Sequence, residues 1–215
     1  MNWQAGDVQA RNNGGIGPVL VWNEPDGLWD IHCDRYLFGD PSGGVTPFQN
    51  AGLIRKSGGT STTGFGVYLA NSGAVEADIG TISFGGYSNS SSASLSISLG
   101  GASPGSGYGR ISFSTPLAAS GTFSVNTRNG FLPSPGETFQ VLSFPSATNQ
   151  FECVSGLDLG GGILLQPEFS STGLTFLAAA YTTNASLPQL FINTTLGGLA
   201  SPLGAQKRLD CIRDE

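Results

Sequence analysis

The chain has 215 residues, a formal net charge of −6 at neutral pH and only nine Lys and Arg residues. So few basic side chains argue against a phosphate-binding surface, and nucleic acid is therefore not an expected partner. No apolar stretch approaches the roughly 18 residues that a membrane-spanning helix needs, so no membrane span is expected either.

The composition favours strands and turns over helices. The chain contains 33 Gly and 12 Pro, and only 11% of its residues are charged. Short runs of Val, Ile, Leu and Phe alternate with Gly-Gly, Asn-Gly and Pro-Ser pairs, which are strand and turn signals. A hydrophobic content of 39%, with 13 Phe, is too apolar for a disordered chain. The sequence therefore predicts a folded, all-β protein.

A short unit recurs in the first third of the chain. The segment from Phe48 to Ile54 recurs as Leu69 to Val75, an offset of 21 residues, and both copies contain Asn-x-Gly between apolar residues. A looser copy lies 27 residues earlier if Asn23 is matched to Asn50. Repeats of this length are typical of β-solenoids, in which each coil covers the apolar face of the previous one.

The repeated Asn and Gly each have a predicted role in such coils. Asn23, Asn50 and Asn71 are expected to form a structural ladder, because side-chain amides in equivalent turns can bond to one another across coils. The Gly two residues later is expected to permit a left-handed or tight backbone. The same register places Arg55 next to Glu76 and predicts an ion pair between adjacent coils.

Beyond Gly80 the repeat becomes less regular. The Gly- and Ser-rich stretch from Gly85 to Ser92 is predicted to be an exposed excursion or a hinge. The strict alternation in Ser94 to Leu99 predicts a strand with one buried face. Further strands are expected over residues 110–114, 121–127, 138–144, 150–154, 163–169 and 174–178.

Two groups of segments carry a family resemblance. Residues 50–59 and 71–77 resemble the Asn-x-Gly coils of large secreted bacterial surface proteins, and residues 108–142 resemble the segment that follows such coils. The resemblance covers about residues 3–178 and implies a right-handed parallel β-helix of the autotransporter-passenger kind. It brings no catalytic residues with it.

The expected fold is therefore all-β, with right-handed parallel β-helix (solenoid) coils followed by a β-rich closing region. We place the coils in residues 1–100 and the closing region in residues 101–181. Residues 182–215 are expected to be an irregular tail, such as the cut end of a longer chain.

Acidic residues near the only histidine are the candidates for catalysis. His32 lies between Asp30 and Asp34, and strand alternation places all three on one side, as an acid/base centre or a metal site would need. β-Helix enzymes that cleave polysaccharides use carboxylate pairs, which makes the acids of this region candidates too. A solvated polar face and turn-forming Asp residues explain the same pattern, and we favour them. No metal and no cofactor are expected. The candidate acids are Asp26, Asp30, Asp34 and Asp40.

Aromatic residues in the same region are candidates for ligand binding. Rows of exposed rings on a flat sheet can stack on sugars, whereas the competing interpretation, which we prefer, places these rings in the core or an end cap. Cys33 and Cys153 are expected to be small buried side chains, and Cys211 is expected to be exposed in the tail. The candidate ligand-binding residues are Trp22, Trp29, Tyr36 and Tyr68.

The sequence thus favours a non-enzymatic structural or adhesive module of an extracellular bacterial surface protein, whose export signal would lie outside this sequence. Polysaccharide or cell-surface glycan is the expected class of partner. The alternative is a β-helix carbohydrate-active enzyme, a glycoside hydrolase or polysaccharide lyase, that uses the Asp carboxylates. A carbohydrate-binding module without catalysis is a third hypothesis.

Overall fold

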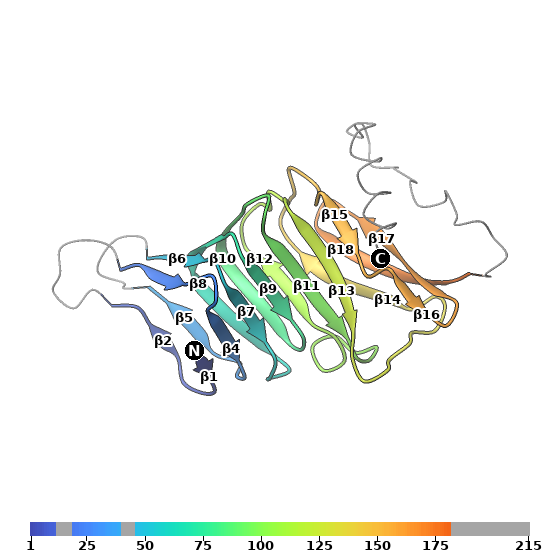
Figure 1. Ribbon diagram of the computed structural model, residues 1–215, viewed down its shortest axis with the longest axis horizontal. Coiled ribbons are helices and arrows are strands. Elements are labelled where there is room, and N and C mark those ends of the chain that lie inside the picture. Colours follow the sequence, from blue (N-terminus) through green and yellow to red (C-terminus); the bar gives the residue numbers. More distant parts are fainter. Residues whose placement is uncertain (12–18, 40–45, 182–215) are drawn as a thin grey trace.

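The computed structural model describes residues 1–11, 19–39 and 46–181, and within these ranges every regular element is a β-strand (Figure 1). Accordingly, no helix in the described residues could cross a membrane. The strands are β1 (Asn2–Trp3), β2 (Val8–Gln9), β3 (Val21–Asn23), β4 (Leu28–Ile31), β5 (Tyr36–Phe38), β6 (Pro47–Asn50), β7 (Leu53–Lys56), β8 (Thr62–Asn71), β9 (Ala74–Ala77), β10 (Thr81–Asn89), β11 (Ser94–Leu99), β12 (Arg110–Phe113), β13 (Thr122–Thr127), β14 (Thr138–Ser143), β15 (Cys153–Ser155), β16 (Asp158–Gly160), β17 (Ile163–Phe169) and β18 (Gly173–Ala180).

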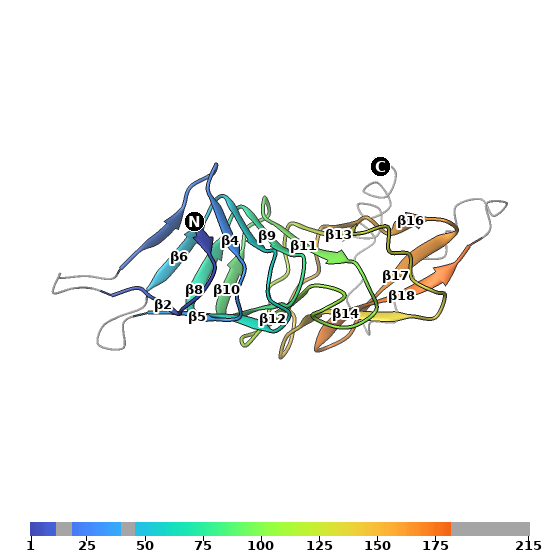
Figure 2. The same cartoon turned by 90° about the horizontal axis from the view of Figure 1, so that it is seen from below.

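The strands form two sheets between which the chain passes repeatedly (Figure 2). The first sheet has the order β1-β4-β7-β9-β11-β13-β15, and all its pairs are parallel. The second contains β2, β5, β8, β10, β12 and β14 in parallel, followed by antiparallel β18, β17 and β16. From β7 to β16, consecutive strands belong to alternate sheets. Each strand from β7 to β13 therefore lies beside strands that are one passage earlier and one passage later in the chain.

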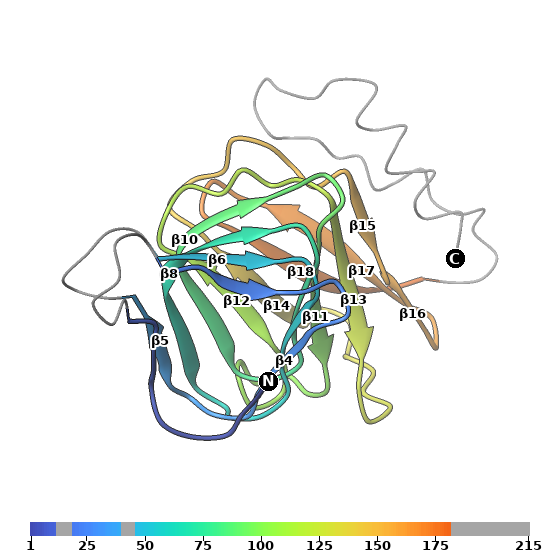
Figure 3. The same ribbon diagram turned by 60° about the vertical axis from the view of Figure 1, so that its left-hand side comes forward.

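The long strand β8 joins two parts of the second sheet. Its first half pairs with β5 and its second half with β6, which in turn pairs with β3. Figure 3 shows β6, β8 and β10 side by side. In this register Asn23 lies opposite Asn50, and Asn50 opposite Asn71. The offsets of 27 and 21 residues found in the sequence are thus strand pairings.

Inward-facing side chains of successive strands stack to form the core. Phe65, Phe84 and Phe113 occupy paired positions on β8, β10 and β12 and are buried. Their ring centroids lie 5.2 and 5.8 Å apart, and Phe48 lies 5.8 Å from Phe65. Ring contacts of this kind add about 0.5–1.5 kcal/mol each to simple burial. Repetition of the same residue type at one position therefore makes the core continuous.

The Gly- and Ser-rich stretch was predicted wrongly. Residues 85–89 belong to β10, Tyr87 is only 8% exposed, and the pairing of β10 with β8 shifts register between Phe84 and Gly86. The shift changes which residues of β10 face inward, so that Tyr87 rather than Gly86 follows Phe84 into the core. The sequence did not reveal this strand because it is rich in Gly and because a register irregularity interrupts the alternation of inward and outward residues.

The strands expected beyond residue 108 correspond to β12, β13, β14, β15, β17 and β18, with bounds that differ by a few residues. Parallel pairing does not stop at residue 100, the predicted end of the coils. Strands beyond that residue still pair in parallel, as far as β13 with β15. Antiparallel pairing begins only with β14 and β18. The predicted tail over 182–215 lies outside the described residues.

The glycines of the Asn-x-Gly turns have a role other than the one expected. Gly52 and Gly73 do not have a positive φ. Instead, a Cβ on Gly73 would lie 2.2 Å from the carbonyl oxygen of Gly52, and a Cβ on Gly52 would lie 2.3 Å from that of Gly27. Successive turns therefore approach too closely for any side chain, and this contact explains the glycines.

We expect Gly73→Ala to lower the free energy of unfolding by about 1–3 kcal/mol, because the added methyl group must push the adjacent turn away. Gly66→Ala is the matched control, since its Cβ would keep 3.5 Å from the nearest atom. Urea denaturation of both variants measures the difference. Equal stability of the two would show that the turns can separate at little cost.

Candidate functional site

The asparagines proposed as a ladder form one hydrogen-bonded column. Asn23 Nδ2 donates to Asn50 Oδ1 at 2.7 Å, and Asn50 Nδ2 donates to Asn71 Oδ1 at 2.7 Å. Asn71 Nδ2 continues the column to Asn89 Oδ1 at 2.9 Å. Sequence reasoning missed Asn89, because it follows the register shift in β10. The column satisfies buried amides and offers no group for chemistry.

Asp30, the first of the candidate acids, is held by several partners on the outer face of the first sheet. Arg55 donates to it twice, from Nε at 3.3 Å and from a terminal nitrogen at 2.7 Å. Ser57 Oγ donates at 2.6 Å, and His32 Nε2 lies 3.3 Å away. The Asp30 side chain is only 13% exposed. Both of its oxygens are thus already occupied.

These contacts fix the protonation state of Asp30. The hydrogen bond from Arg55 is the main cause that lowers the pKa of Asp30 from 3.8 to about 2, with Ser57 assisting and burial opposing. A general acid in glycoside cleavage needs a raised pKa, so Asp30 is unsuited to that role. His32 and Asp30 are brought together as predicted, whereas Asp34, expected beside them, pairs with Lys56 instead. The favoured interpretation of a solvated polar face was wrong for Asp30, because its partners cover most of the side chain.

The lowered pKa gives a pH-dependent stability. Since the folded-state pKa lies below the ordinary value, the contribution of Asp30 is complete above about pH 4 and is lost as the pH falls through 2. We expect Asp30→Asn to lower the free energy of unfolding by about 1–2 kcal/mol at pH 7. The range is reduced because solvent screens a partly exposed ion pair. The difference from the natural chain should vanish near pH 1.5, as measured by urea denaturation at both pH values. Asp26→Asn, which changes an exposed turn residue, is the control.

Arg55 does not form the ion pair that the sequence predicted. The register is correct, since Arg55 lies opposite Glu76, but the guanidinium bonds to Asp30 on the other neighbouring strand. Burial is the main cause that raises the pKa of Glu76, and nearby Asp78 adds to it. Asp78 itself accepts a hydrogen bond from Ser98 Oγ at 2.6 Å.

Asp34 has a structural partner, which is a lysine inside the protein. Lys56 is fully buried, and its Nζ lies 2.8 Å from Asp34 Oδ1. The same nitrogen donates to Thr63 Oγ1 and to the carbonyl oxygens of Cys33 and Gly58, at 2.9–3.0 Å. Lys56 thereby ties the turn after β4 to the turn after β7 and to the start of β8.

The remaining candidate acids add no catalytic pair. Asp26 is exposed in the turn between β3 and β4, and Asp40 lies outside the described residues. Within the described ranges, no group of three or more His, Cys, Asp or Glu side chains is arranged to hold a metal ion. Asp30 and Asp34 are each neutralised by a different cation, Arg55 and Lys56.

The three cysteines differ in their surroundings. Cys33 is buried and free, and burial raises the pKa of its thiol. Cys153 is also buried but is disulfide-bonded, which corrects its interpretation as a simple buried side chain. Cys211 lies outside the described residues.

Four aromatic side chains are exposed on the outer face of the second sheet. We call these four the aromatic surface. Three of them were candidates from the sequence, whereas Phe38 was missed, although the burial of Leu37 between Tyr36 and Phe38 implies by alternation that both rings face outward. The members and their exposed fractions are Trp22 (56%), Tyr36 (55%), Phe38 (37%) and Tyr68 (43%).

Trp29, the fourth sequence candidate, does not belong to this surface. It packs edge-on against Trp3 and Phe48, with ring centroids 6.5 and 5.0 Å apart. Trp29 shares the inward face of β4 with buried Ile31. Trp29 therefore agrees with the preferred prediction, which placed these rings in the core or an end cap.

Glycines on adjacent strands let two of the exposed rings lie against the sheet. A Cβ on Gly64 would lie 2.5 Å from ring atoms of Tyr36, and a Cβ on Gly86 would lie 2.8 Å from the ring of Tyr68. Each ring therefore occupies the space that a neighbouring side chain would fill.

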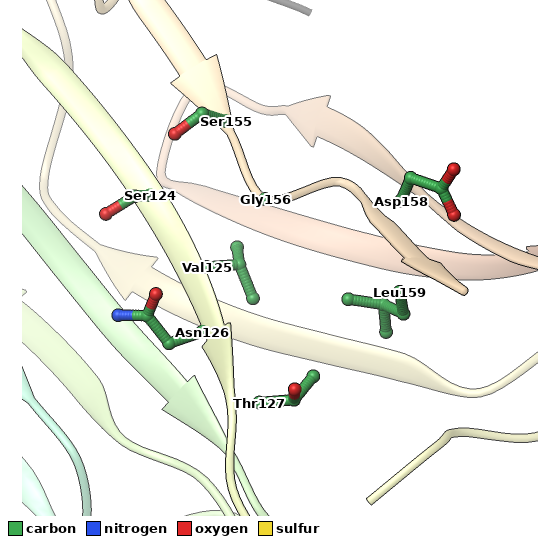
Figure 4. A pocket seen from close by; sticks show the side chains of 8 residues that line it. All are labelled: Ser124, Val125, Asn126, Thr127, Ser155, Gly156, Asp158 and Leu159. Atoms are coloured by element: carbon green, nitrogen blue, oxygen red, sulfur yellow. The ribbon is translucent and has the colours of Figure 1, made fainter. Parts of the chain in front are cut away.

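A polar recess of about 320 Å³ lies between β13 and the turn that joins β15 to β16 (Figure 4). Asp158, its only carboxylate, already accepts hydrogen bonds from the backbone of Gly160 at 2.9 Å and from Tyr181 Oη at 3.0 Å. A single acid used by its own turn does not make a hydrolytic centre. The lining residues are Ser124, Val125, Asn126, Thr127, Ser155, Gly156, Asp158 and Leu159.

Comparison of the chain with protein-family models, curated proteins and solved structures gave no match. The functional argument therefore depends on the residues themselves. They offer a stack of strands with a buried hydrogen-bonded asparagine column, an ion-pair cluster around Asp30 and one exposed aromatic surface. Of these, the aromatic surface has the groups best suited to contact another molecule.

Proposed function

We propose that this chain is a structural or adhesive module of an extracellular bacterial surface protein, built as a right-handed parallel β-helix. The observation that carries the proposal is the in-register column of Asn23, Asn50, Asn71 and Asn89, in which each amide bonds to its equivalent one passage later. A chain that alternates between two parallel sheets while it keeps such a column has the local geometry of stacked coils.

The end of the stack supports the same proposal. Parallel coils would extend from β1 to β15, and β16, β17 and β18 would close the last one through antiparallel pairing with β14. A solenoid needs atypical end units, because its last coil otherwise exposes both its core and its strand edge. An atypical end unit of this kind would suit a spacer or presenting module.

The alternative, a polysaccharide-cleaving β-helix enzyme, has less support. Its best candidate acids would be Asp30 and Asp34. Arg55 lowers the pKa of Asp30, and Asp34 is paired with the buried Lys56. Cleavage by a glycoside hydrolase needs one carboxyl group that stays protonated near its working pH. No pair with that division of roles stands out among the described acids.

Two measurements test the proposal. Antibodies raised against the purified chain should label intact cells of the source bacterium, and protease added outside the cells should remove that label. Incubation of the chain with a panel of plant, fungal and bacterial polysaccharides should release no reducing ends or unsaturated products. Labelling only after lysis would refute the surface location, whereas cleavage abolished by Asp30→Asn would establish the enzyme instead.

A further inference from the structure

We infer that the aromatic surface is a binding platform for a neutral polysaccharide, whose sugar rings stack on Trp22, Tyr36, Phe38 and Tyr68. The inference rests on the proposed adhesive function and names the class of ligand. Its first support is exposure, because each of these large apolar rings is between 37% and 56% exposed. Single exposed aromatics are ordinary, but four on one sheet face form a patch that calls for a partner.

The strand register places the four rings in sequence along the sheet. Tyr36 lies opposite Gly64, the backbone of Phe38 is next to Gly66, and Tyr68 follows on the same strand as these glycines. Trp22 is aligned through Gln49 with Ala70. Residues 64, 66, 68 and 70 face the same side of β8, so the rings follow one another at intervals of roughly 7 Å along the strand direction. Because Tyr36 and Phe38 lie on β5, Tyr68 on β8 and Trp22 on β3, the rings are also displaced across the sheet by one or two strand spacings of about 5 Å. They form a band along the sheet on which an extended chain of sugar rings can lie.

Glycines on the adjacent strands leave room for two of the rings close to the sheet. A Cβ on Gly64 or Gly86 would come within 2.8 Å of the ring of Tyr36 or Tyr68. This close contact restricts the positions that the two rings can take before any ligand arrives, which lowers the conformational cost of binding. A sugar ring presents C–H groups on its face and hydroxyl groups at its edge, and it therefore needs an apolar plane with polar neighbours.

Amide side chains lie between the rings, and charged side chains lie at the edge of the surface, where Asp7 Oδ1 accepts from the backbone N–H of Tyr36 at 3.0 Å and Arg11 Nε donates to Gln9 Oε1 at 2.6 Å. Gln49 is exposed between Trp22 and Ala70, and Gln9 pairs with Phe38 on the adjacent strand. Amide side chains can donate to and accept from hydroxyl groups. The outward positions of the described strands β3, β5, β6, β8 and β10 contain no Asp, Glu, Lys or Arg. Charge therefore favours a neutral polysaccharide over an anionic one.

A second protein fits this face less well. Between the rings, the outward positions carry mostly Gly, Ser, Thr and Ala, such as Gly64, Gly66, Ala70 and Ser88. The buried centre of a protein interface needs interdigitating side chains at the density of a protein interior. A row of flat rings over small residues provides little to interdigitate with, whereas a polysaccharide chain can lie along it.

Affinity electrophoresis tests the inference with soluble hydroxyethylcellulose, mixed-linkage β-glucan, xylan, mannan and dextran as neutral probes and polygalacturonate as the anionic one. We expect at least one neutral polysaccharide to retard the chain, and Tyr36→Ala or Tyr68→Ala to weaken that binding by about three- to tenfold. Gly64→Ala should weaken it as well, because the new Cβ displaces the Tyr36 ring while every aromatic residue remains. Leu28→Ala, which changes a residue 40% exposed on the other sheet, should bind as the natural chain does.

Three results would overturn the inference. They are absence of retardation by every neutral polysaccharide, binding that persists unchanged in a Tyr36→Ala, Tyr68→Ala double variant, and stronger binding to polygalacturonate than to any neutral probe. Sedimentation that shows self-association lost in the double variant would assign the surface to a second copy of the chain. Circular dichroism of each variant separates loss of binding from loss of fold. The surface-labelling result stands independently, so failure here leaves the structural function intact.

Discussion

Replacing Lys56 by Met should lower the free energy of unfolding by about 3–5 kcal/mol, the largest effect we expect of any single substitution in this chain. The Lys56 ammonium is fully buried and donates to Asp34, Thr63 and two backbone carbonyl groups. Met fills a similar volume but donates no hydrogen bond, so the Asp34 carboxylate and the Gly58 carbonyl lose this donor, whereas the Cys33 carbonyl keeps its bond from Thr63 Oγ1. Urea denaturation monitored by tryptophan fluorescence measures the loss.

A double-mutant cycle separates the ion pair from the backbone contacts. Asp34 is one-third exposed, so Asp34→Asn alone should cost about 1 kcal/mol, because water can replace part of the lost pairing. In the Lys56→Met background, Asp34→Asn should cost less than it does alone, since the carboxylate no longer has its partner. Arg110→Met, which removes a surface cation bonded to Gln140 at 3.4 Å, is the control. A Lys56→Met loss no larger than that of the control would contradict the buried-cation account.

The position of Lys56 could have been read from the sequence, but only against a common assumption. Strand alternation places Lys56 on the same side of β7 as Ile54, which is buried, and Arg55 on the other side. Lysine is so rarely buried that alternation alone does not single out Lys56 as a core residue. The strand pairing that sets Arg55 opposite Glu76 also sets Lys56 opposite buried Ala77.

Other features were predictable where alternation is unbroken. Ser94 to Leu99 is a strand as expected, because Leu95, Ile97 and Leu99 are all buried. The Asn pairings followed from the 21- and 27-residue offsets. Prediction failed at residues 85–89, where a register shift changes the inward positions. It failed also for the Gly role at residue 73, because close approach between passages depends on a neighbour 21 residues away in the chain.

The candidate acids could not be assessed from the sequence for a similar reason. Asp30 looks like a free carboxylate until β7 places Arg55 beside it, 25 residues later. The pKa that decides its chemistry is thus set by a residue outside its local sequence. The preferred placement of the aromatic residues in the core or an end cap was wrong for Trp22, Tyr36 and Tyr68, which are exposed. Alternation around buried Leu37 and Leu69 already directs Tyr36 and Tyr68 outward.

Replacing Asn50 by Ala should destabilise the protein by about 2–4 kcal/mol, because Asn50 occupies the middle of the asparagine column. Its oxygen accepts from Asn23, while its nitrogen donates to Asn71 and to the carbonyl of Ala74 at 3.0 Å. The variant loses these bonds and leaves the amides of two neighbours partly unsatisfied in a buried site. Asn23→Ala, at the end of the column, should cost less, and thermal or urea unfolding of the two variants compares them.

The column also predicts how substitutions combine. Once Asn50 is removed, Asn71 has already lost one donor, so Asn71→Ala should cost less in the Asn50→Ala background than in the natural chain, by about 0.5–3 kcal/mol. Hydrogen bonds in a chain polarise one another, which adds to this coupling. Asn126→Ala, on β13 and outside the column, supplies the additive control. If Asn50→Ala and Asn71→Ala prove strictly additive, each amide stabilises only its own turn, and stacking between passages must come from the apolar core alone.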